Sequence, residues 1–146
     1  MPDLPDGQEL PRAGHALRAV TALVVAAAVV ERDGRFLVTR RQQGVHLEGY
    51  WEFPGGKCEP GESIADCLVR ELWEELAVVG RVGEELFAVT HHYVDRDVEL
   101  HFFACALAGE PAPQLGQTMR WVPREELRTL TFPPADAELI DRLARM

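Results

Sequence analysis

Cysteine is scarce in this sequence, with three residues among 146, at positions 58, 67 and 105. No two of them form a C-x-x-C pair, and an odd number leaves one without a partner. This pattern argues against a zinc site and predicts a reducing, cytoplasmic setting. We therefore expect Cys58, Cys67 and Cys105 to be small, buried or half-buried hydrophobic side chains.

Positive charge is also in short supply. The chain has 15 lysines and arginines against 24 aspartates and glutamates, which gives a formal net charge of −9. A protein that grips a nucleic-acid backbone needs a basic patch to displace counterions, so no nucleic-acid polymer is expected as a partner. An acidic protein that handles free phosphates needs metal ions or a local basic cluster to bridge the repulsion.

Long hydrophobic runs are missing as well. Residues 19–30 are apolar except for Thr21, and Arg12 and Arg18 precede them, which faintly imitates a signal peptide. The run is shorter than the roughly 20 residues that a membrane-spanning helix needs. It also leads directly into a turn and a second strand, without a small-residue cleavage site. A buried strand is the better interpretation, and no membrane partner is expected.

The length fits a single domain with a proper core. Residues 1–17 hold three prolines and no periodicity, so we expect a flexible tail, followed by one domain over residues 18–146. Asp33-Gly34 predicts a hairpin turn. Strands before, between and after two helices predict an α/β fold with a mixed sheet flanked by helices. The expected strands cover residues 20–31, 36–39, 82–94, 98–108 and 120–122. The expected helices cover residues 64–76 or 64–79, and 135–145.

The most informative stretch is acidic. Glu71, Glu74 and Glu75 fall on one face of the expected first helix, which Ser63 is placed to cap. Like charges at this spacing repel each other, at a cost of about 0.2–0.5 kcal/mol per pair in an isolated helix. A solvated acidic face is the plain interpretation. A divalent cation with oxygen ligands is the functional one, because it would relieve the repulsion.

The spacing decides between these interpretations. Gly56, five residues, Glu62, seven residues, and then Arg70-Glu71-Leu72-x-Glu74-Glu75-x-Ala77-Val78 resembles the signature box of the Nudix hydrolases, G-x5-E-x7-R-E-U-x-E-E-x-G-U. Every polar position of the pattern is filled. The one departure is Ala77 in place of the second glycine, and Gly80 is expected to assume the helix-ending role. The resemblance implies an α/β/α sandwich and an enzyme that hydrolyses phosphoric anhydride bonds.

The resemblance also implies roles for individual residues. Glu71 would be the general base, and Arg70 would orient a glutamate by a charge-assisted hydrogen bond. The expected cofactor is Mg²⁺, with Mn²⁺ as an alternative. Its expected ligands are Glu71, Glu74, Glu75 and the carbonyl of Gly55. Glu62 and Gly56 would support the loop or the outer shell of the metal.

Similarity to the MutT-like branch, whose members act on 8-oxo-dGTP or CTP, extends through residues 50–59 and 132–135. It implies six substrate-binding residues: Arg41, His46, Lys57, Tyr93, Arg96 and Asp136. Three of these residues have an equally good plain interpretation: His46 as a loop residue, Lys57 as a surface lysine and Tyr93 as a strand aromatic. An 8-oxo-guanine-specific relative has Asn at the position of Asp136. An ionised Asp only accepts hydrogen bonds and suits an exocyclic amine, whereas a protonated Asp in a dry pocket recovers a donor.

MutT-like members often carry a further metal-binding Glu in the loop after the long hairpin. Leu115 stands there in this chain, so the metal count would be lower or Glu110 would substitute. The expected activity is hydrolysis of a nucleoside triphosphate to a monophosphate and pyrophosphate, which would sanitise the nucleotide pool. The first alternative is a Nudix hydrolase of CTP or of other nucleotide derivatives, such as nucleotide sugars, dinucleoside polyphosphates or capped RNA 5′ ends. The second is a non-catalytic nucleotide sensor.

Overall fold

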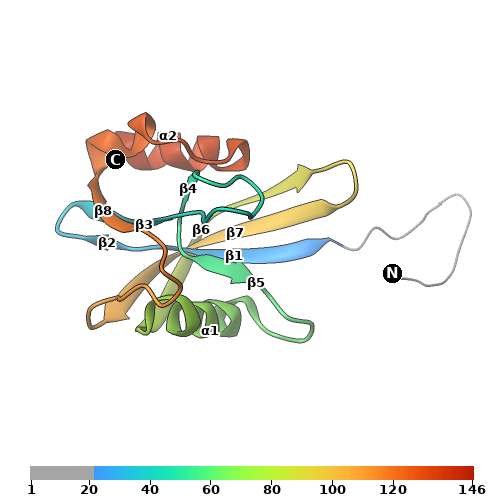
Figure 1. The fold of residues 1–146 in the computed structure, drawn as a ribbon, viewed down its shortest axis with the longest axis horizontal. Helices are drawn as coiled ribbons and strands as arrows, with labels where there is room; N and C mark the ends of the chain where they lie inside the picture. The colour runs from blue at the N-terminus through green and yellow to red at the C-terminus, as the bar shows by residue number, and fades with distance from the viewer. Residues whose placement is uncertain (1–21) are drawn as a thin grey trace, which may run out of the picture.

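The computed structural model describes residues 22–146. A layer of strands lies between two helices, α1 below and α2 above in Figure 1. The expected α/β/α sandwich is therefore confirmed. The tail expected over residues 1–17 lies outside the described residues. No helix in the described part is long and apolar enough to cross a membrane.

The first sheet is mixed and contains the long strands. Its order is β5-β1-β7-β6. β1 pairs in parallel with β7 and antiparallel with β5, and β6 and β7 form a long antiparallel hairpin. β1, at the centre, therefore connects the glycine strand β5 to the hairpin. The bounds are β1 Leu23–Val29, β5 Gly55–Lys57, β6 Val79–His92 and β7 Asp97–Ala108.

The second sheet is antiparallel and smaller. Its central strand β3 pairs with β2, β4 and β8. Asp33 and Gly34 both have positive φ, 54° and 75°, as a tight two-residue hairpin turn requires, which confirms the predicted turn. The strands are β2 Glu31–Arg32, β3 Arg35–Arg40, β4 Trp51–Glu52 and β8 Met119–Pro123.

Helix α1 spans Ile64–Leu76. Ser63 caps it as predicted, because its hydroxyl accepts a hydrogen bond from the backbone N–H of Asp66 at 3.1 Å. The chain beyond β8 forms two short 3₁₀ turns, η2 Arg124–Thr129 and η3 Pro134–Asp136, and then α2 Ala137–Arg145. The last helix thus begins two residues later than expected, because Pro134 opens a tighter turn that ends at Asp136.

The two helices cover opposite faces of the sheets. Alternate residues of β1 divide between two cores: Ala26 and Ala28 face α1, whereas Ala27 and Val29 face α2. The α2 core is closed by Leu139, Ile140 and Leu143, as the helical pattern predicts, together with Phe36, Phe53 and Phe102. The α1 core is closed by Leu37, Leu68, Leu72 and Leu76.

Of the two expected ends of α1 the structure has the earlier one, Leu76, and the helix-ending role expected of Gly80 is wrong. Ala77 itself adopts the left-handed conformation, with φ 52° and ψ 41°, and its N–H donates to the carbonyl of Trp73. Gly80 lies within β6 and has a packing role instead. A Cβ there would stand 2.4 Å from Cδ1 of Leu72, so only glycine lets this strand approach the helix.

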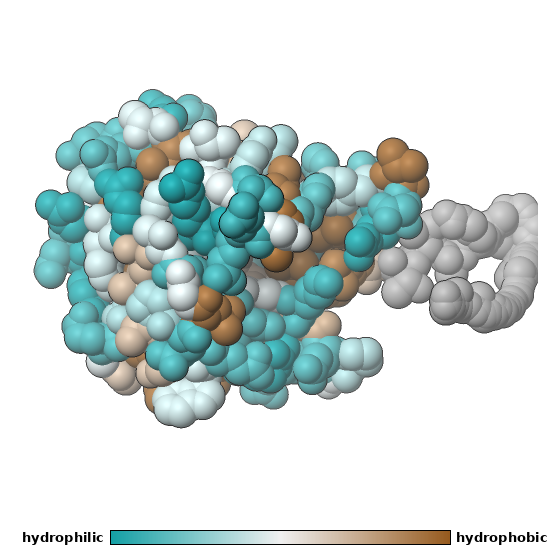
Figure 2. Space-filling view, in the orientation of Figure 1, coloured by the Kyte–Doolittle hydropathy of each residue, from teal (hydrophilic) through white to brown (hydrophobic). Residues whose placement is uncertain are grey.

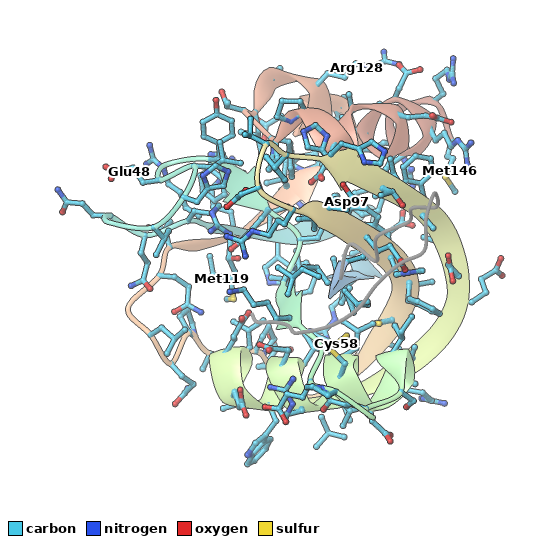
Figure 3. All side chains as sticks on the ribbon, turned by 90° about the vertical axis from the view of Figure 1, so that its right-hand side faces the viewer. Glu48, Cys58, Asp97, Met119, Arg128 and Met146 are labelled. Carbon is cyan, nitrogen blue, oxygen red and sulfur yellow. A yellow bond between two sulfur atoms is a disulfide. The ribbon has the colours of Figure 1, made fainter. Side chains whose placement is uncertain are left out.

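The cysteine prediction is wrong for two of the three residues. Cys58 and Cys67 form a disulfide with a Cα–Cα distance of 5.2 Å, and only Cys105 is a free, buried thiol. Nine positions separate the two partners in sequence, and the loop between them turns back onto α1. Spacing alone could not show this, because the pairing depends on the path of that loop. Cys58 is labelled beside α1 in Figure 3.

Candidate active site

A cavity of about 790 Å³ opens beside β1, between α1 and the turn that precedes α2. Six segments of the chain form its wall: β1, the loop after β3, the β4–β5 stretch, α1, the N-terminal part of β7 with the turn before it, and η3. The size suits a nucleotide-sized ligand. On the face of the molecule that Figure 2 shows, most residues are hydrophilic, and hydrophobic residues gather toward the right of the view.

Two adjacent glycines, Gly55 and Gly56, line the cavity where it meets Glu71 and Glu75 of α1. We call this part of the cavity the reactive end. A Cβ on Gly55 would stand 2.0 Å from the carbonyl oxygen of Ala26, so glycine is needed for β5 to approach β1. A Cβ on Gly56 would lie 2.5 Å from the carboxyl carbon of Glu71. The missing side chain at Gly56 therefore provides the space that the Glu71 carboxylate occupies.

Glu71 and Glu75 project from α1 into the cavity, one turn apart. Burial, followed by the neighbouring carboxylate of Glu71, raises the pKa of Glu75 to about 8, although a hydrogen bond from the backbone of Gly55 opposes the shift. A glutamate with that pKa holds a proton at neutral pH when no cation is nearby. The pair therefore needs a proton or a cation to offset the repulsion between its two carboxylates.

Arg70 organises the surrounding carboxylates. Its guanidinium donates to both oxygens of Glu62, at 2.7 and 2.9 Å, to Glu71 at 3.1 Å and to Glu74 at 3.2 Å. A fourth partner is the backbone carbonyl of Lys57, at 3.0 Å. Hydrogen bonds from Arg70 lower the pKa of Glu62 to about 2, and those to Glu62 raise the pKa of Arg70. This clamp fixes the loop before α1 to the helix.

Glu74 differs from its two neighbours. Its side chain is 55% exposed, against 13% for Glu71, and it is not part of the cavity wall. Within residues 22–146, no three His, Cys, Asp or Glu side chains are already gathered as a metal site. Glu71 and Glu75 still supply the oxygen donors that hard divalent cations prefer. A cation there fits the donor set, because it would replace the retained proton of Glu75 and remove the repulsion.

The opposite end of the cavity holds a buried aspartate. Asp136, 5% exposed, ends η3 and lines the wall. Burial, and to a lesser extent the charge of Glu52, raises the pKa of Asp136 to about 7. Near neutral pH this side chain therefore exists in both its protonated and its ionised form.

Glu52 and Arg41 lie between the two ends. Arg41 donates to Glu52 at 2.8 Å and to the backbone carbonyl of His46, so it holds the loop that follows β3. Burial raises the pKa of Glu52 even though Arg41 opposes the shift. Sequence reasoning missed Glu52 as a site residue. Its position in β4, directly before Phe53-Pro54-Gly55, is the one feature of the sequence that could have pointed to it. Nothing in the neighbouring sequence shows that its side chain faces a cavity.

The remaining predicted substrate residues also line the cavity. His46 and Tyr93 meet edge to face, with ring centroids 5.7 Å apart, across the entrance. Arg96 contributes from the β6–β7 turn, and Lys57 from the end of β5. All six residues expected to bind substrate are thus brought to one cavity, although they come from four segments of the chain.

The NUDIX domain model matches residues 25–142, most of the chain. The chain belongs to the Nudix hydrolase family. It is 36% identical over 118 residues to a CTP pyrophosphohydrolase of Escherichia coli K12, covering 80% of this chain and 87% of the relative. It is 35% identical over 121 residues to an 8-oxo-dGTP diphosphatase of Haemophilus influenzae, covering 82% and 89%.

A solved structure agrees with these sequence relatives. The solution structure of the E. coli ORF135 protein has a TM-score of 0.76 and 33% identity, and the match covers 90% of this chain and 91% of that one. The Nudix fold and the hydrolase family expected from the signature box are confirmed. Nudix hydrolases generally use divalent metals, in keeping with the donor set of Glu71 and Glu75.

In the described part of the chain, the loop that follows the β6–β7 hairpin contributes no further carboxylate to the cavity wall. Leu115 is 56% exposed, and its carbonyl accepts a hydrogen bond from Gln42. Glu110, the expected substitute, pairs with Arg32 at 2.8 Å and does not line the cavity. Gln117 instead donates to the backbone carbonyl of Glu75, at the end of α1, and so supports the helix.

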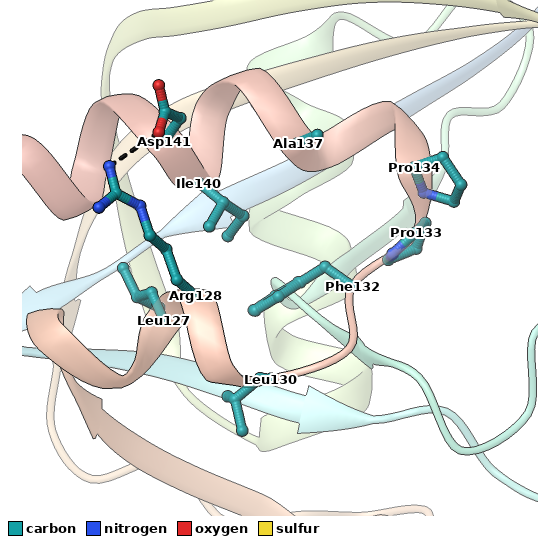
Figure 4. Close-up of a pocket in the computed structure, with 9 residues that line it drawn as sticks. All are labelled: Leu127, Arg128, Leu130, Phe132, Pro133, Pro134, Ala137, Ile140 and Asp141. Carbon is teal, nitrogen blue, oxygen red and sulfur yellow. Dashed lines mark hydrogen bonds and ion pairs between the residues drawn. The ribbon is translucent and has the colours of Figure 1, made fainter.

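A second, smaller hollow of about 400 Å³ lies between η2 and α2 of the Nudix fold. Figure 4 shows Phe132, Leu127 and Ile140 around it, with the ion pair between Arg128 and Asp141 at its edge. It has no pair of facing carboxylates like that of Glu71 and Glu75. We therefore assign the chemistry to the larger cavity.

Proposed function

We propose that this Nudix hydrolase cleaves nucleoside triphosphates into a nucleoside monophosphate and pyrophosphate, with Mg²⁺ as its cofactor. The observation that carries the proposal is the polarity of one cavity: a carboxylate pair, Glu71 and Glu75, at one end and the buried Asp136 at the other. A nucleoside triphosphate fits this arrangement, because its phosphates would bind the cation held by the carboxylate pair while its base reaches Asp136. Removal of oxidised or surplus nucleotides is the role that we assign to this activity.

The reactive end would work as follows. Mg²⁺, when bound, neutralises charge on the phosphate oxygens. Glu75 and the carbonyl of Gly55 would hold the cation, with Glu74 as a further expected ligand. Glu71 accepts a proton from the attacking water, and Arg70 keeps the Glu71 carboxylate aimed at that position through its 3.1 Å hydrogen bond. Glu62 is a positioning residue, because it acts on Glu71 only through Arg70.

Cationic side chains in the cavity offset the negative charge of the protein. Arg41, Lys57 and Arg96 all line it, in a chain whose formal net charge is −9. They would attract the triphosphate and hold its outer oxygens. Arg41 would also couple the phosphates to the loop of residues 42–49, since its guanidinium supports the carbonyl of His46.

Asp136 would read the base, and its protonation state selects which base. The neutral form both donates and accepts, which matches the O6 and N7–H edge of 8-oxoguanine. The ionised form only accepts, which matches the exocyclic amine of cytosine or of an oxidised adenine. With a pKa raised to about 7, both forms are available, so we propose a substrate range that includes 8-oxo-dGTP and cytidine triphosphates.

Separation of the products by anion-exchange chromatography, after incubation with Mg²⁺ or Mn²⁺, tests the proposal, because it detects both products of every substrate. The panel contains 8-oxo-dGTP, dGTP, CTP, dCTP, 2-hydroxy-dATP, a nucleotide sugar and a dinucleoside polyphosphate. We expect the triphosphates to release pyrophosphate and monophosphate. Faster cleavage of the nucleotide sugar or the dinucleoside polyphosphate would replace our substrate class with the alternative one.

A sensor without catalysis is separated from an enzyme by the same assay. Binding of triphosphates without any product, under both metals, would identify a sensor. Glu84→Gln is a suitable control for Glu75→Gln, since Glu84 is an exposed glutamate of β6 outside the cavity wall. Equal activity of the two variants would remove Glu75 from the metal site.

A further inference from the structure

The disulfide lies inside the signature box itself. Cys58 follows β5 directly, and Cys67 is the fourth residue of α1. Figure 3 places Cys58 next to the helix, on the side that faces the strands. The bridge thus closes the segment of residues 58–67, which contains Glu62 and the helix cap Ser63.

We propose that Cys58 and Cys67 are a reversible redox site, at which small thiols and small disulfides open and close the bridge and thereby change how firmly the Glu62 loop is held against α1. The site goes beyond the proposed nucleotide hydrolysis, because its chemistry does not depend on which nucleotide is cleaved. It is also absent from the sequence pattern of the box, whose glycine, glutamate and arginine positions do not include Cys58 or Cys67.

The loop has a second, non-covalent attachment. Glu62 accepts two hydrogen bonds from Arg70, and its N–H donates to the carbonyl of Glu59 at 3.0 Å. The backbone N–H of Glu59 returns a hydrogen bond to the Glu62 side chain at 2.9 Å. None of these contacts uses a sulfur atom, so we expect them to attach the loop, less firmly, when the bridge is open, and we expect both redox forms to fold. This is the condition for a switch rather than a permanent staple.

The two sulfur-bearing residues differ in accessibility. Cys67 is fully buried against the α1 core, at 0% exposure, whereas Cys58 is partly exposed beside the loop. An attacking thiolate therefore reaches the sulfur of Cys58, and the sulfur of Cys67 is the leaving group. Cys67 lies close to the N-terminal end of α1, where the helix favours negative charge on a thiolate.

The exchange balances as follows. A small thiolate forms a bond to Sγ of Cys58, the Cys58–Cys67 bond breaks, and Cys67 leaves with the electron pair and takes up a proton. A second small thiol then attacks the small-molecule sulfur of the mixed disulfide and releases Cys58 as a thiol. The protein gains two electrons and two protons, and two small thiols become one disulfide. Oxidised glutathione drives the same steps in reverse.

The consequence for the active site follows from three contacts in series. The bridge restrains the loop that carries Glu62, Glu62 holds Arg70, and Arg70 holds Glu71. Opening the bridge leaves Glu62 with more freedom, so Arg70 spends less time in the geometry that aims Glu71. We therefore expect the reduced form to be the less active and less stable one.

Thiol titration under denaturing conditions tests the redox site without any nucleotide. After native incubation in glutathione buffers of graded poise, we expect the protein to pass reversibly between three thiols and one. The reduced form should melt roughly 5–10 °C lower, since the closed loop is short. A bridge that native dithiothreitol cannot open, or thiols that oxidised glutathione cannot join, would each overturn the proposal.

Activity then tests the coupling. Turnover and the half-saturating Mg²⁺ concentration are measured for the oxidised and reduced forms of the wild type, Cys58→Ser and Cys105→Ala. We expect a severalfold loss on reduction in the wild type and in Cys105→Ala, and redox-independent behaviour in Cys58→Ser. Cys67→Ala serves as a second bridge-free variant should Cys58→Ser not fold. Identical kinetics in both redox forms of the wild type would show that the bridge does not act on the active site.

Discussion

The two ends of the active-site cavity are built in different ways. The reactive end comes from one continuous stretch, residues 55–75, and Arg70 ties it together with side-chain hydrogen bonds to three glutamates. The end that we propose to read the base comes from separate loops and the turn η3, and Asp136, which lines it, is surrounded by cavity wall rather than by a clamp. The reactive end is thus specified locally and held rigidly, whereas the base-reading end is assembled from distant residues.

This difference has a functional meaning. Hydrolysis of any nucleotide requires the same arrangement of carboxylates, so rigidity there is an advantage. Choice of base depends on a few hydrogen bonds, each worth about 1–3 kcal/mol of discrimination. We expect mutations at the first end to change the rate for all substrates and those at the second end to change the order of preference.

The largest effect is expected for Glu75→Gln. Loss of the carboxylate should lower turnover by about 10²- to 10⁴-fold for every substrate, because the cation loses its buried ligand. Without metal the variant should be at least as stable as the wild type at neutral pH, since Gln needs no proton to be buried beside Glu71, whereas Glu75, with its pKa raised to about 8, must take one up on folding. Steady-state kinetics and thermal melting check both statements. A loss confined to one substrate would contradict the expected difference between the two ends of the cavity.

Glu62→Gln should lower turnover by about 10- to 100-fold, because it weakens the clamp on Arg70 without touching substrate. The matched control is Glu59→Gln, in the same exposed loop. The pKa of Glu62 is depressed to about 2, so the clamp contributes fully above the ordinary glutamate pKa and is lost only as the pH falls toward 2. A pH–rate profile of the wild type should therefore show no clamp-related step between pH 6 and 9.

Asp136→Asn should leave the turnover of the best substrate within the same order of magnitude and change the ranking. Asn donates and accepts at all pH values, so the ratio of kcat/KM for 8-oxo-dGTP to that for CTP should rise about tenfold at pH 8. Parallel kinetics on the two nucleotides measure this ratio. An unchanged ranking would mean that Asp136 does not read the base.

The wild-type preference should itself depend on pH. The pKa of Asp136 is raised to about 7, so the neutral, donating form prevails below that pH and the ionised form above it. The ratio of kcat/KM for 8-oxo-dGTP to CTP should thus rise as the pH falls from 8 to 6. The ratio should be nearly flat in Asp136→Asn, and a parallel slope in the variant would assign the effect to another group.

The smallest effect is expected at the end of α1. Ala77→Gly removes the cost of a left-handed alanine and should raise the free energy of unfolding by about 1 kcal/mol. Turnover should not change, because Ala77 does not line the cavity. Urea denaturation and steady-state kinetics provide the two measurements. A kinetic change would extend the reactive end beyond Glu75.

Much of the fold could be predicted from local signals. The Asp33-Gly34 turn, the Ser63 cap and the burial of Leu139, Ile140 and Leu143 all follow from short-range patterns, and the structure has each of them. The choice between Leu76 and Val79 as the end of α1 could not be made from the sequence, because nothing local shows that β6 needs Gly80 to pack against Leu72. The helix therefore ends on Ala77 at a conformational cost.

By itself, the sequence determined the family, the acidic helix and the succession of strands and helices along the chain, because each depends on patterns within continuous segments. Only the tertiary structure decided the order of strands within the sheets, that Glu74 is exposed outside the cavity wall, that Glu52 joins Arg41 in the cavity and that Glu110 pairs with Arg32 instead. It also decided that Cys58 meets Cys67. Such contacts depend on how loops return to the sheet, and burial of Asp136 raises its pKa only after those loops have closed around it.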